Sequence, residues 1–420
     1  MSKINESLEV FYVNNVKIVN IKNSNKTGVF SVYIENGSIY ERRAEYGYAH
    51  LLEHMFFNGT QKMSASEIDR KFANLCAITN AYTANNNTCY SVDFLPERAK
   101  ESITLFLEMI FDATFEASEI EKEKGIIVEE LNANSKSIEG TFDERRIDRI
   151  VEKKYSRDVA GSKKSVNGAT REGLLNYLKR TLHNKSVVLI CCGNVTNNDL
   201  IQWISESVNC IGNSFASREI KSDPVFKEPF GDKNYKLEVK KNIVQSKIVF
   251  TSPPCSAYGR FSDAETLLYY MLGGESYSLL YDELRVKRGL CYEVFSDHAI
   301  YRFPDALLYE IQTGVSHQNV DKCVDAMQAV FDKIAREGVD REFFEVAKKR
   351  FRSDVIRSSE TSMGQTFLLS FDSFFKENPI TIDEKLNAYD DITMEECMEV
   401  ARTHFTLDKN CWSVLTKEKS

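Results

Sequence analysis

Residues 47–60 read GYAHLLEHMFFNGT, and two of the 6 histidines in the chain lie within five residues of each other here. The spacing of the apolar residues predicts a helix over residues 45–57. On a helix, residues i, i+3 and i+4 share one face, which places the side chains of His50, Glu53 and His54 together. The apolar residues between them fall on the other faces and can anchor the helix in a hydrophobic core.

The rest of the first half alternates strand and helix patterns around this helix. Strands are predicted at residues 16–19, 29–35, 88–95 and 186–195, and further helices at residues 98–111 and from about 118 through 130. The run SVVLICCGNV in the last of these strands is mostly apolar, which is typical of a strand with both faces buried.

The second half repeats this order of elements. Strands are predicted at residues 247–252 and 307–313, and helices at residues 262–272, 320–335 and 340–357. The segment TLLYYMLGG corresponds to HLLEHMFFNG of the first half, without the histidines and the glutamate. Two copies of one α+β unit account for this order. The expected domains are residues 1–212 and 235–420, joined by a linker at 213–234 where the apolar periodicity stops.

Composition narrows the class of protein. With 42% hydrophobic and 28% charged residues the chain has the composition of a globular protein, and 420 residues suffice for two domains. The net charge of −8 argues against nucleic-acid binding. No stretch has the length and apolarity of a membrane span, so no membrane insertion is expected. The absence of a signal-peptide pattern and of CxxC pairs favours a reducing cytoplasm.

The pattern H-x-x-E-H on one helical face suggests a metal site. Imidazole nitrogens bind zinc readily, and a catalytic zinc has three protein ligands and one open position. A glutamate next to the metal can act as general base towards the water bound there. The order is the reverse of the commoner H-E-x-x-H motif. Alternatively, the helix is half-exposed and its histidines are satisfied by other protein groups. A metal site needs a third ligand from elsewhere in the chain.

The segment ENGSIYERRAEYGYAHLLEHMFFNGT resembles the zinc-binding segment of the pitrilysin/insulinase family of metallopeptidases. In that family the third ligand is a glutamate 76 residues after the second histidine, with another glutamate seven residues before it. The segment EKGIIVEE has the same spacing, because Glu130 lies 76 positions after His54 and Glu123 lies seven before Glu130. The resemblance therefore implies that His50, His54 and Glu130 bind one Zn²⁺ and that Glu123 orients the site. Glu129 points about 100° away from Glu130 on a helix.

Two further segments extend the resemblance. NAYTANNNTCY is similar to the family's strand beside the zinc, and it implies that Asn80 and Ala81 bind the substrate backbone by β-addition. The preceding CAIT lacks the glycines that many members carry there. LGGESYSLLYDELRVKRGLCYEVFS is similar to the segment that carries an arginine and a tyrosine seven residues apart. These are Arg285 and Tyr292 here, and they would hold the substrate and steady the developing oxyanion.

The resemblance, which points to the short two-domain bacterial and mitochondrial-processing-peptidase-like branch, implies a zinc-dependent endopeptidase with Glu53 as the general base. In the family, four such domains form a clam-like chamber around a peptide substrate. This chain supplies two of them, which implies a homodimer or a heterodimer with a related subunit. Either maturation of a dedicated precursor peptide or general peptide degradation fits. The alternative is a non-catalytic scaffold subunit, which predicts a broken set of ligands.

Overall fold

The computed structural model describes residues 4, 7–134, 137–183, 186–208, 224–228, 230, 234–239, 243–274, 276–302, 305–405 and 411–418. The chain divides into two compact units. Unit 1 comprises Met1–Asn134, Arg157–Lys221 and Val355–Leu386, and unit 2 comprises Ser135–Ser156, Ser222–Asp354 and Asn387–Ser420. Each unit is therefore built from segments that are distant in sequence.

Unit 1 contains a six-stranded sheet in the order β1-β2-β6-β3-β5-β4. Its strands are β1 (Ser7–Val13), β2 (Val16–Lys22), β3 (Gly28–Ile34), β4 (Ile78–Thr83), β5 (Thr88–Phe94) and β6 (Val187–Gly193). Only β2 and β6 pair in parallel, and the other neighbours are antiparallel. Strand β4 is the last strand of the sheet, so its outer edge has no strand partner within the described residues.

Unit 2 repeats this topology in a five-stranded sheet of order β7-β11-β8-β10-β9. Its strands are β7 (Tyr235–Val239), β8 (Ser246–Thr251), β9 (Cys291–Arg302), β10 (Ala306–Val315) and β11 (Cys411–Lys417). The parallel pair β7 and β11 corresponds to β2 and β6, and the remaining neighbours are antiparallel as in unit 1. The predicted α+β class, with two similar and mostly antiparallel sheets, is confirmed.

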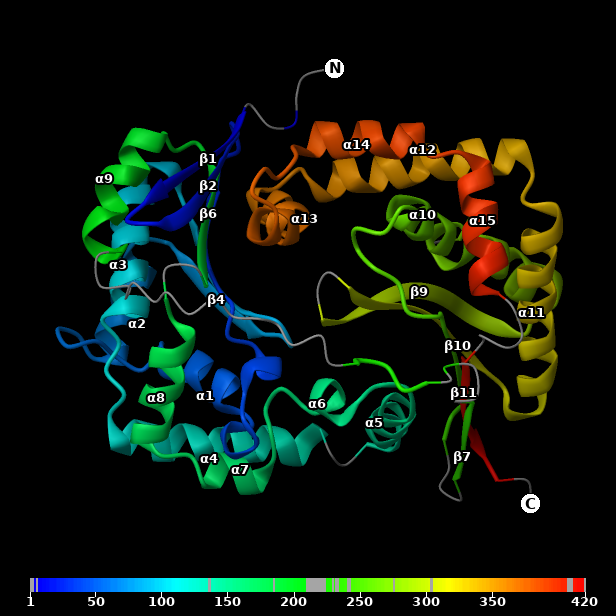
Figure 1. Ribbon diagram of the computed structural model, residues 1–420, viewed down its shortest axis with the longest axis horizontal. Coiled ribbons are helices and arrows are strands. Elements are labelled where there is room, and N and C mark those ends of the chain that lie inside the picture. Colours follow the sequence, from blue (N-terminus) through cyan, green and yellow to red (C-terminus); the bar gives the residue numbers. More distant parts are fainter. Residues whose placement is uncertain are drawn as a thin grey trace. The chain divides into compact units, whose positions relative to one another are not determined.

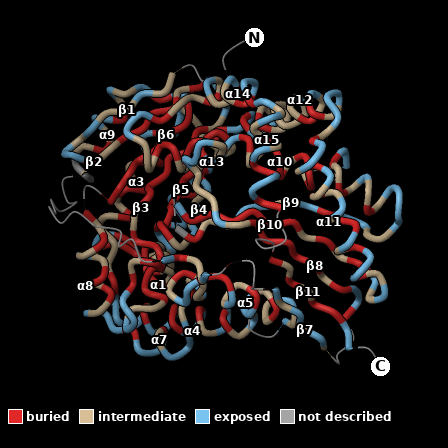
Figure 2. The backbone as a smooth tube through the Cα atoms, turned by 45° about the vertical axis from the view of Figure 1, so that its right-hand side comes forward, coloured by how far each residue is buried: buried red, intermediate tan, exposed pale blue. Residues whose placement is uncertain are grey.

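The central strands β3 and β6 of unit 1 are buried along their whole length because both faces of the sheet are covered. Every residue of β3 and of β6 is buried, and Figure 2 shows the buried colour running along them. In unit 1, α3 and α9 lie on one side of the sheet and α13 on the other (Figure 1). A strand covered on both sides has no solvent-facing positions, so its sequence cannot alternate.

The helices of unit 1 are α1 (Tyr48–Met55), α2 (Ala65–Asn74), α3 (Ala99–Phe111), α4 (Ala117–Asn134), α7 (Lys163–Asn167), α8 (Arg171–Thr181), α9 (Asn197–Val208) and α13 (Ser362–Phe375). Those of unit 2 include α5 (Ile138–Ile150), α6 (Lys153–Ser156), α10 (Ser262–Gly273), α11 (Val320–Glu337) and α15 (Met394–His404). Helices α12 (Arg341–Ser358) and α14 (Ile382–Asp391) contain residues of both units. None of the described helices is long and apolar enough to cross a membrane.

One predicted helix boundary is wrong. The helix expected over residues 45–57 begins at Tyr48, because the preceding residue, Gly47, has a φ of +91°. A residue in the left-handed region cannot continue a right-handed helix. Upstream of it, Arg43–Glu45 forms a separate turn of 3₁₀ helix.

Each unit includes helical segments from the opposite half of the sequence. Helix α13 packs on β6 and β3 of unit 1, where Asn23 Nδ2 donates to Gln365 Oε1 at 2.8 Å. Helix α5 packs on the sheet of unit 2, where its fully buried Phe142 contacts Val249 and Leu415. The domain limits 1–212 and 235–420 stay a prediction, and residues 213–223 of the predicted linker lie outside the described residues.

Candidate active site

Helix α1 presents three of the predicted site residues on one face. Its opposite face is held in the core of unit 1 by side chains with 0% exposure, namely Leu51, Leu52 and Met55. His50, Glu53 and His54 are each partly buried, so the core does not enclose them. The imidazole rings of His50 and His54 lie 4.7 Å apart between centroids. The apolar pattern of the helix therefore positions its polar face.

Helix α4 packs against α1 and brings Glu130 to the two histidines. Ligand atoms of His50, His54 and Glu130 lie within 4.8 Å of one another, and His54 Nε2 is 4.0 Å from Glu130 Oε2. No other group of three His, Cys, Asp or Glu side chains in the described part of the chain lies as close together. Glu129 is exposed and accepts a hydrogen bond from Asn132.

This donor set fits a catalytic zinc ion. Two imidazole nitrogens and one carboxylate oxygen form the His₂Glu set, and zinc binds such ligands at about 2.0–2.2 Å. Glu130 has an exposed side chain, so core packing does not fix its carboxylate away from the two histidines. His50 Nδ1 is buried without a hydrogen-bond partner in the described structure, so no protein group occupies that nitrogen.

The two histidines have different surroundings. Burial, together with the nearby His54, lowers the pKa of His50 to about 4. His50 is therefore neutral at pH 7, which is the form that binds a metal. The Nδ1 atom of His54 lies 2.9 Å from Glu123 Oε2. A carboxylate at this nitrogen holds the proton there and directs Nε2 towards Glu130.

The surroundings of Glu53 suit a general base. Its Oε2 atom accepts a hydrogen bond from the hydroxyl of Thr83 on β4. Burial raises the pKa of Glu53, against the hydrogen bond from Thr83 and the charge of His54. A raised pKa brings a carboxylate closer to neutral pH, where a general base is most effective. The sequence analysis missed Thr83, although strand alternation places it on the face of β4 that α1 covers.

The predicted substrate residues Asn80 and Ala81 lie on β4. Asn80 is exposed, and its Oδ1 accepts a hydrogen bond from the backbone N–H of Ala81 at 2.9 Å. Because β4 is an edge strand, another extended chain can add to its outer edge, although in this structure the N–H of Ala81 is bonded to the side chain of Asn80.

The predicted arginine–tyrosine pair belongs to unit 2. Arg285 lies on the π-helix η4 (Tyr281–Lys287), and its Nη1 donates to the backbone carbonyl of Tyr292 at 2.6 Å. Its guanidinium carbon is 4.4 Å from the centroid of the Tyr292 ring. Tyr292 is 73% exposed at the start of β9. The structure thus brings Arg285 and Tyr292 together in unit 2. In unit 1 it brings together the five residues predicted for the metal site, namely His50, Glu53, His54, Glu123 and Glu130.

Helix α10 of unit 2 is the counterpart of α1 and carries no metal site. Thr266, Tyr269 and Tyr270 occupy the positions of His50, Glu53 and His54 in the aligned segments. The first two form internal contacts instead. Thr266 Oγ1 lies 2.8 Å from the hydroxyl of Tyr309, and the hydroxyl of Tyr269 lies 3.2 Å from His404 Nδ1. This copy has the same architecture without the ligands.

Two family models match most of the sequence. Residues 17–163 match the model of insulinase (peptidase family M16), and residues 168–351 match that of the peptidase M16 inactive domain. The uncharacterized zinc protease YmxG of Bacillus subtilis is 26% identical over 405 residues, covering 94% of this chain and 95% of that protein. The beta subunit of rat mitochondrial-processing peptidase is 26% identical over 190 residues, covering 45% of this chain and 39% of that protein.

Solved structures share the fold at low sequence identity. A peptidase M16 inactive domain from Pseudomonas fluorescens has a TM-score of 0.85 at 16% identity, covering 98% of this chain and 99% of that one. A protease from Helicobacter pylori has a TM-score of 0.84 at 18% identity, covering 98% of this chain and all of that one. The matched family models extend over both halves of the sequence. This chain belongs to peptidase family M16, the pitrilysin/insulinase family of metallopeptidases.

Proposed function

We propose that this chain is a zinc-dependent endopeptidase that binds one Zn²⁺ and cleaves peptides or unfolded segments. The observation that carries the proposal is the convergence of His50, His54 and Glu130 beside the partly buried Glu53. A scaffold subunit that had lost catalysis would be expected to lack one of these groups. The likeness to proteins named zinc proteases supports the same assignment.

Each residue of the site has a role that follows from its chemistry. A bound zinc ion supplies Lewis acidity, which polarises the scissile carbonyl and lowers the pKa of the attacking water. Glu53 takes a proton from that water and passes it to the leaving amine. Glu123 fixes the ring of His54, and Thr83 fixes the carboxylate of Glu53.

Substrate binding is proposed to use two surfaces. The free edge of β4, at Asn80 and Ala81, pairs with the extended peptide backbone. Arg285 and Tyr292 supply a guanidinium and a phenol, which hold the backbone and steady the oxyanion. Arg285 stacks on the ring of Tyr292, so both groups are already oriented before a substrate binds.

We further infer a dimer that encloses its substrate in a clam-like chamber. One chain carries both the metal set and the Arg285–Tyr292 pair, so two identical chains are sufficient. A heterodimer is the other outcome, supported by the likeness to a mitochondrial-processing peptidase chain named as one subunit. Every cysteine in the described part of the chain is free, which fits a cytoplasmic location. Enclosure favours short or unfolded substrates, whether one dedicated precursor peptide or many.

The proposal is tested by metal analysis together with cleavage of a quenched peptide library. Wild type is expected to bind zinc at one ion per chain and to cleave. Glu53→Gln is expected to bind the same zinc and lose at least about a thousandfold in kcat, because the general base is gone. A wild type that binds zinc but is as inactive as Glu53→Gln would overturn the peptidase assignment. Solution mass measured on the same sample distinguishes a homodimer from a monomer that needs a different subunit.

A second comparison addresses the pair in unit 2. Tyr292→Phe keeps the ring that stacks on Arg285 and removes only the hydroxyl. It is expected to lower kcat about 100- to 1,000-fold with unchanged zinc content, because an oxyanion donor is lost. Tyr281→Phe, which alters the other ring beside Arg285 at 5.1 Å, is the matched control and should retain activity. Equal kcat in all three proteins would remove Tyr292 from the mechanism.

A further inference from the structure

Helix α1, which carries His50 and His54, begins without a capping side chain of its own. The first N–H groups of an α-helix have no partner within the helix and are usually satisfied by the side chain of the N-cap residue. The N-cap of α1 is Gly47, which has no side chain to do this. The carboxylate of Glu41 takes its place. Its Oε2 accepts from the N–H of Gly47 at 3.1 Å, and its Oε1 accepts from the N–H of Ala49 at 2.9 Å.

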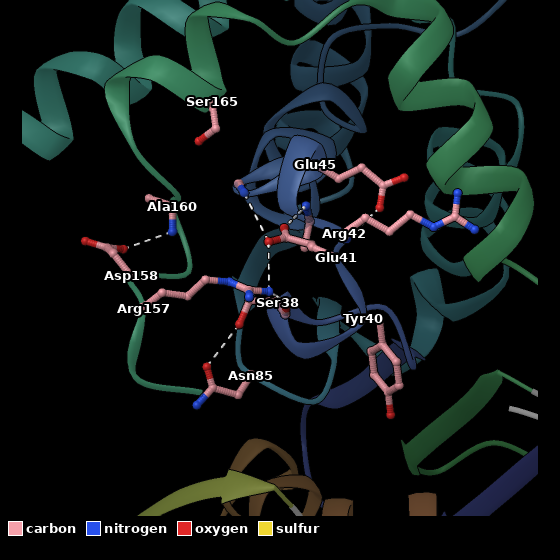
Figure 3. Close-up of polar contacts among 12 residues, drawn as sticks. Ser38, Tyr40, Glu41, Arg42, Glu45, Asn85, Arg157, Asp158, Ala160 and Ser165 are labelled. Carbon is pink, nitrogen blue, oxygen red and sulfur yellow. Dashed lines mark hydrogen bonds and ion pairs between the residues drawn. The ribbon is translucent and has the colours of Figure 1, made fainter. Parts of the chain in front are cut away.

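Arg157 accompanies this buried carboxylate. The side chain of Glu41 is 0% exposed and that of Arg157 is 7% exposed, and Arg157 Nη2 lies 3.4 Å from Glu41 Oε2. The same guanidinium donates to the backbone carbonyl of Ser38 (Figure 3). Its carbon also lies 4.0 Å from the centroid of the Tyr46 ring. The guanidinium balances the carboxylate's charge where water cannot reach it.

The loop that carries Arg157 also abuts the start of α1 through its backbone. A Cβ at Gly47 would lie 2.5 Å from the carbonyl oxygen of Ala160, and one at Gly161 would lie 2.5 Å from that of Tyr46. Asp158 holds the loop in shape, since its Oδ1 accepts from the N–H of Ala160 at 2.9 Å (Figure 3). The carboxylate of Glu41 and the loop at residues 157–161 therefore both hold the first turn of α1 in place.

One of these contacts fixes the residue next to a proposed metal ligand. Ala49, whose N–H bonds Glu41, directly precedes His50. Helix α1 has only 8 residues, and so short a helix has little stability of its own. Within a helix, each residue is turned by about 100° from the previous one. Fixing the first turn therefore fixes the directions of both histidines, His50 and, one turn later, His54.

We propose that Glu41, held by Arg157, is a positioning residue for the metal site, because it fixes the first turn of α1 and thereby the directions of His50 and His54. This inference rests on the proposed zinc-binding function. Neither Glu41 nor Arg157 carries a signal in the local sequence pattern, and 116 residues separate them.

A purely structural role is the competing explanation. The apolar face of α1 keeps the helix in the core by itself, through three fully buried side chains. Loss of the Glu41 carboxylate should therefore leave the fold in place while loosening the first turn. The affinity for metal and the coordination geometry of a bound metal ion are sensitive to that loosening. The content of secondary structure is not.

The test compares Glu41→Gln with wild type and with Glu45→Gln. Glu45 lies four residues on, is also bonded to an arginine, and accepts from the backbone N–H of Arg42 at 2.8 Å. No hydrogen bond joins Glu45 to α1 among the described residues, which makes it a matched control. Burial raises the pKa of Glu41 to about 7, against the N–H of Ala49, the charge of Arg157 and the N–H of Gly47. Measurements at pH 8 keep the carboxylate ionised.

The probes are Zn²⁺ affinity by chelator competition and the visible absorption spectrum of the Co²⁺-substituted protein. Glu41→Gln is expected to weaken zinc binding about 10- to 100-fold, which is the typical effect of losing a contact that orients metal ligands. It is also expected to change the Co²⁺ spectrum. The amide NH₂ of the new side chain faces a backbone N–H that the carboxylate had satisfied. Glu45→Gln should bind zinc as wild type does, because Glu45 makes no hydrogen bond to α1 among the described residues.

If Glu41→Gln alone is too unstable to purify, the double variant Glu41→Gln with Arg157→Met removes both buried charges. Its stability should recover, since no unpaired charge is left, while its zinc affinity should stay at least tenfold below that of wild type. Wild-type zinc affinity in either folded variant would overturn the positioning role. A wild type that binds no zinc would instead overturn the proposed function, so the two failures are distinguishable.

Discussion

The Nδ1 atom of His54 lies 2.9 Å from Oε2 of Glu123, although the two residues are 69 positions apart in the sequence. Helix α1 supplies the histidine and helix α4 the glutamate. Because α4 also carries Glu130, one helix both orients a ring and supplies the proposed ligand that the ring faces. The geometry of the site thus depends on how α1 and α4 pack.

Glu123→Gln tests this dependence. The substitution keeps the size of the side chain but removes the charge that favours a proton on His54 Nδ1, so zinc affinity is expected to fall about 10- to 100-fold. The measurement is chelator competition, with far-UV circular dichroism to verify the fold. Glu129→Gln on the same helix is the control and should bind zinc as wild type does. An unchanged affinity in Glu123→Gln would show that the contact does not orient the ring.

Thr83→Val tests the hydrogen bond to Glu53. That bond opposes the burial that raises the pKa of Glu53, so its loss should raise the pKa further. A general base works only when deprotonated, so the acidic limb of the kcat profile should move towards higher pH. Thr83→Ser, which keeps the hydroxyl, should restore the wild-type profile. Superimposable profiles for wild type and Thr83→Val would contradict the prediction.

The metal-free protein is expected to lose stability in acid through His50. The pKa of this side chain is about 4 in the folded chain and about 6.5 when unfolded. The unfolded chain therefore binds the proton first as pH falls. The contribution of His50 is fully present above pH 6.5 and decreases as pH falls towards 4, by up to about 3 kcal/mol.

Urea unfolding in the presence of a chelator, at several pH values, measures this effect. His50→Gln should unfold with a flatter dependence on pH between 6.5 and 4. His298→Gln is the control, because the side chain of His298 is 54% exposed, and it should keep the wild-type dependence. Parallel curves for wild type and His50→Gln would contradict the assignment.

The ion pair between Arg146 of α5 and Glu310 of β10 is expected to matter for stability. Nη1 and Nη2 of Arg146 lie 2.6 and 2.9 Å from the two carboxylate oxygens of Glu310, and the side chains are 6% and 8% exposed. Arg146→Met leaves a buried carboxylate without its partner, which should lower the free energy of unfolding by about 3–5 kcal/mol.

The double variant Arg146→Met with Glu310→Met provides the matched comparison in urea unfolding. It should recover most of that loss, because replacing both charges by apolar groups avoids leaving one unpaired. Single and double variants of equal stability would mean that the packing of α5, and not the balance of charge, determines the effect.

Much of the fold follows from short-range patterns. The apolar runs predicted β3 and β6, and helical spacing predicted α3, α4, α11 and α12 to within a few residues. The repeated order of elements predicted two similar sheets, and the structure has them. These predictions succeed because burial on one or both faces leaves a period in the sequence that can be read locally.

The sequence by itself also determined which groups of α1 share a face, since the i, i+3, i+4 relation of His50, Glu53 and His54 is a property of any helix. It could not determine what those groups meet. The contact of Thr83 with Glu53, the ion pair of Arg157 with Glu41, and the placement of α13 on the sheet of unit 1 are each made by segments distant along the chain. Only the tertiary structure decided these, because packing between distant segments leaves no period in the local sequence.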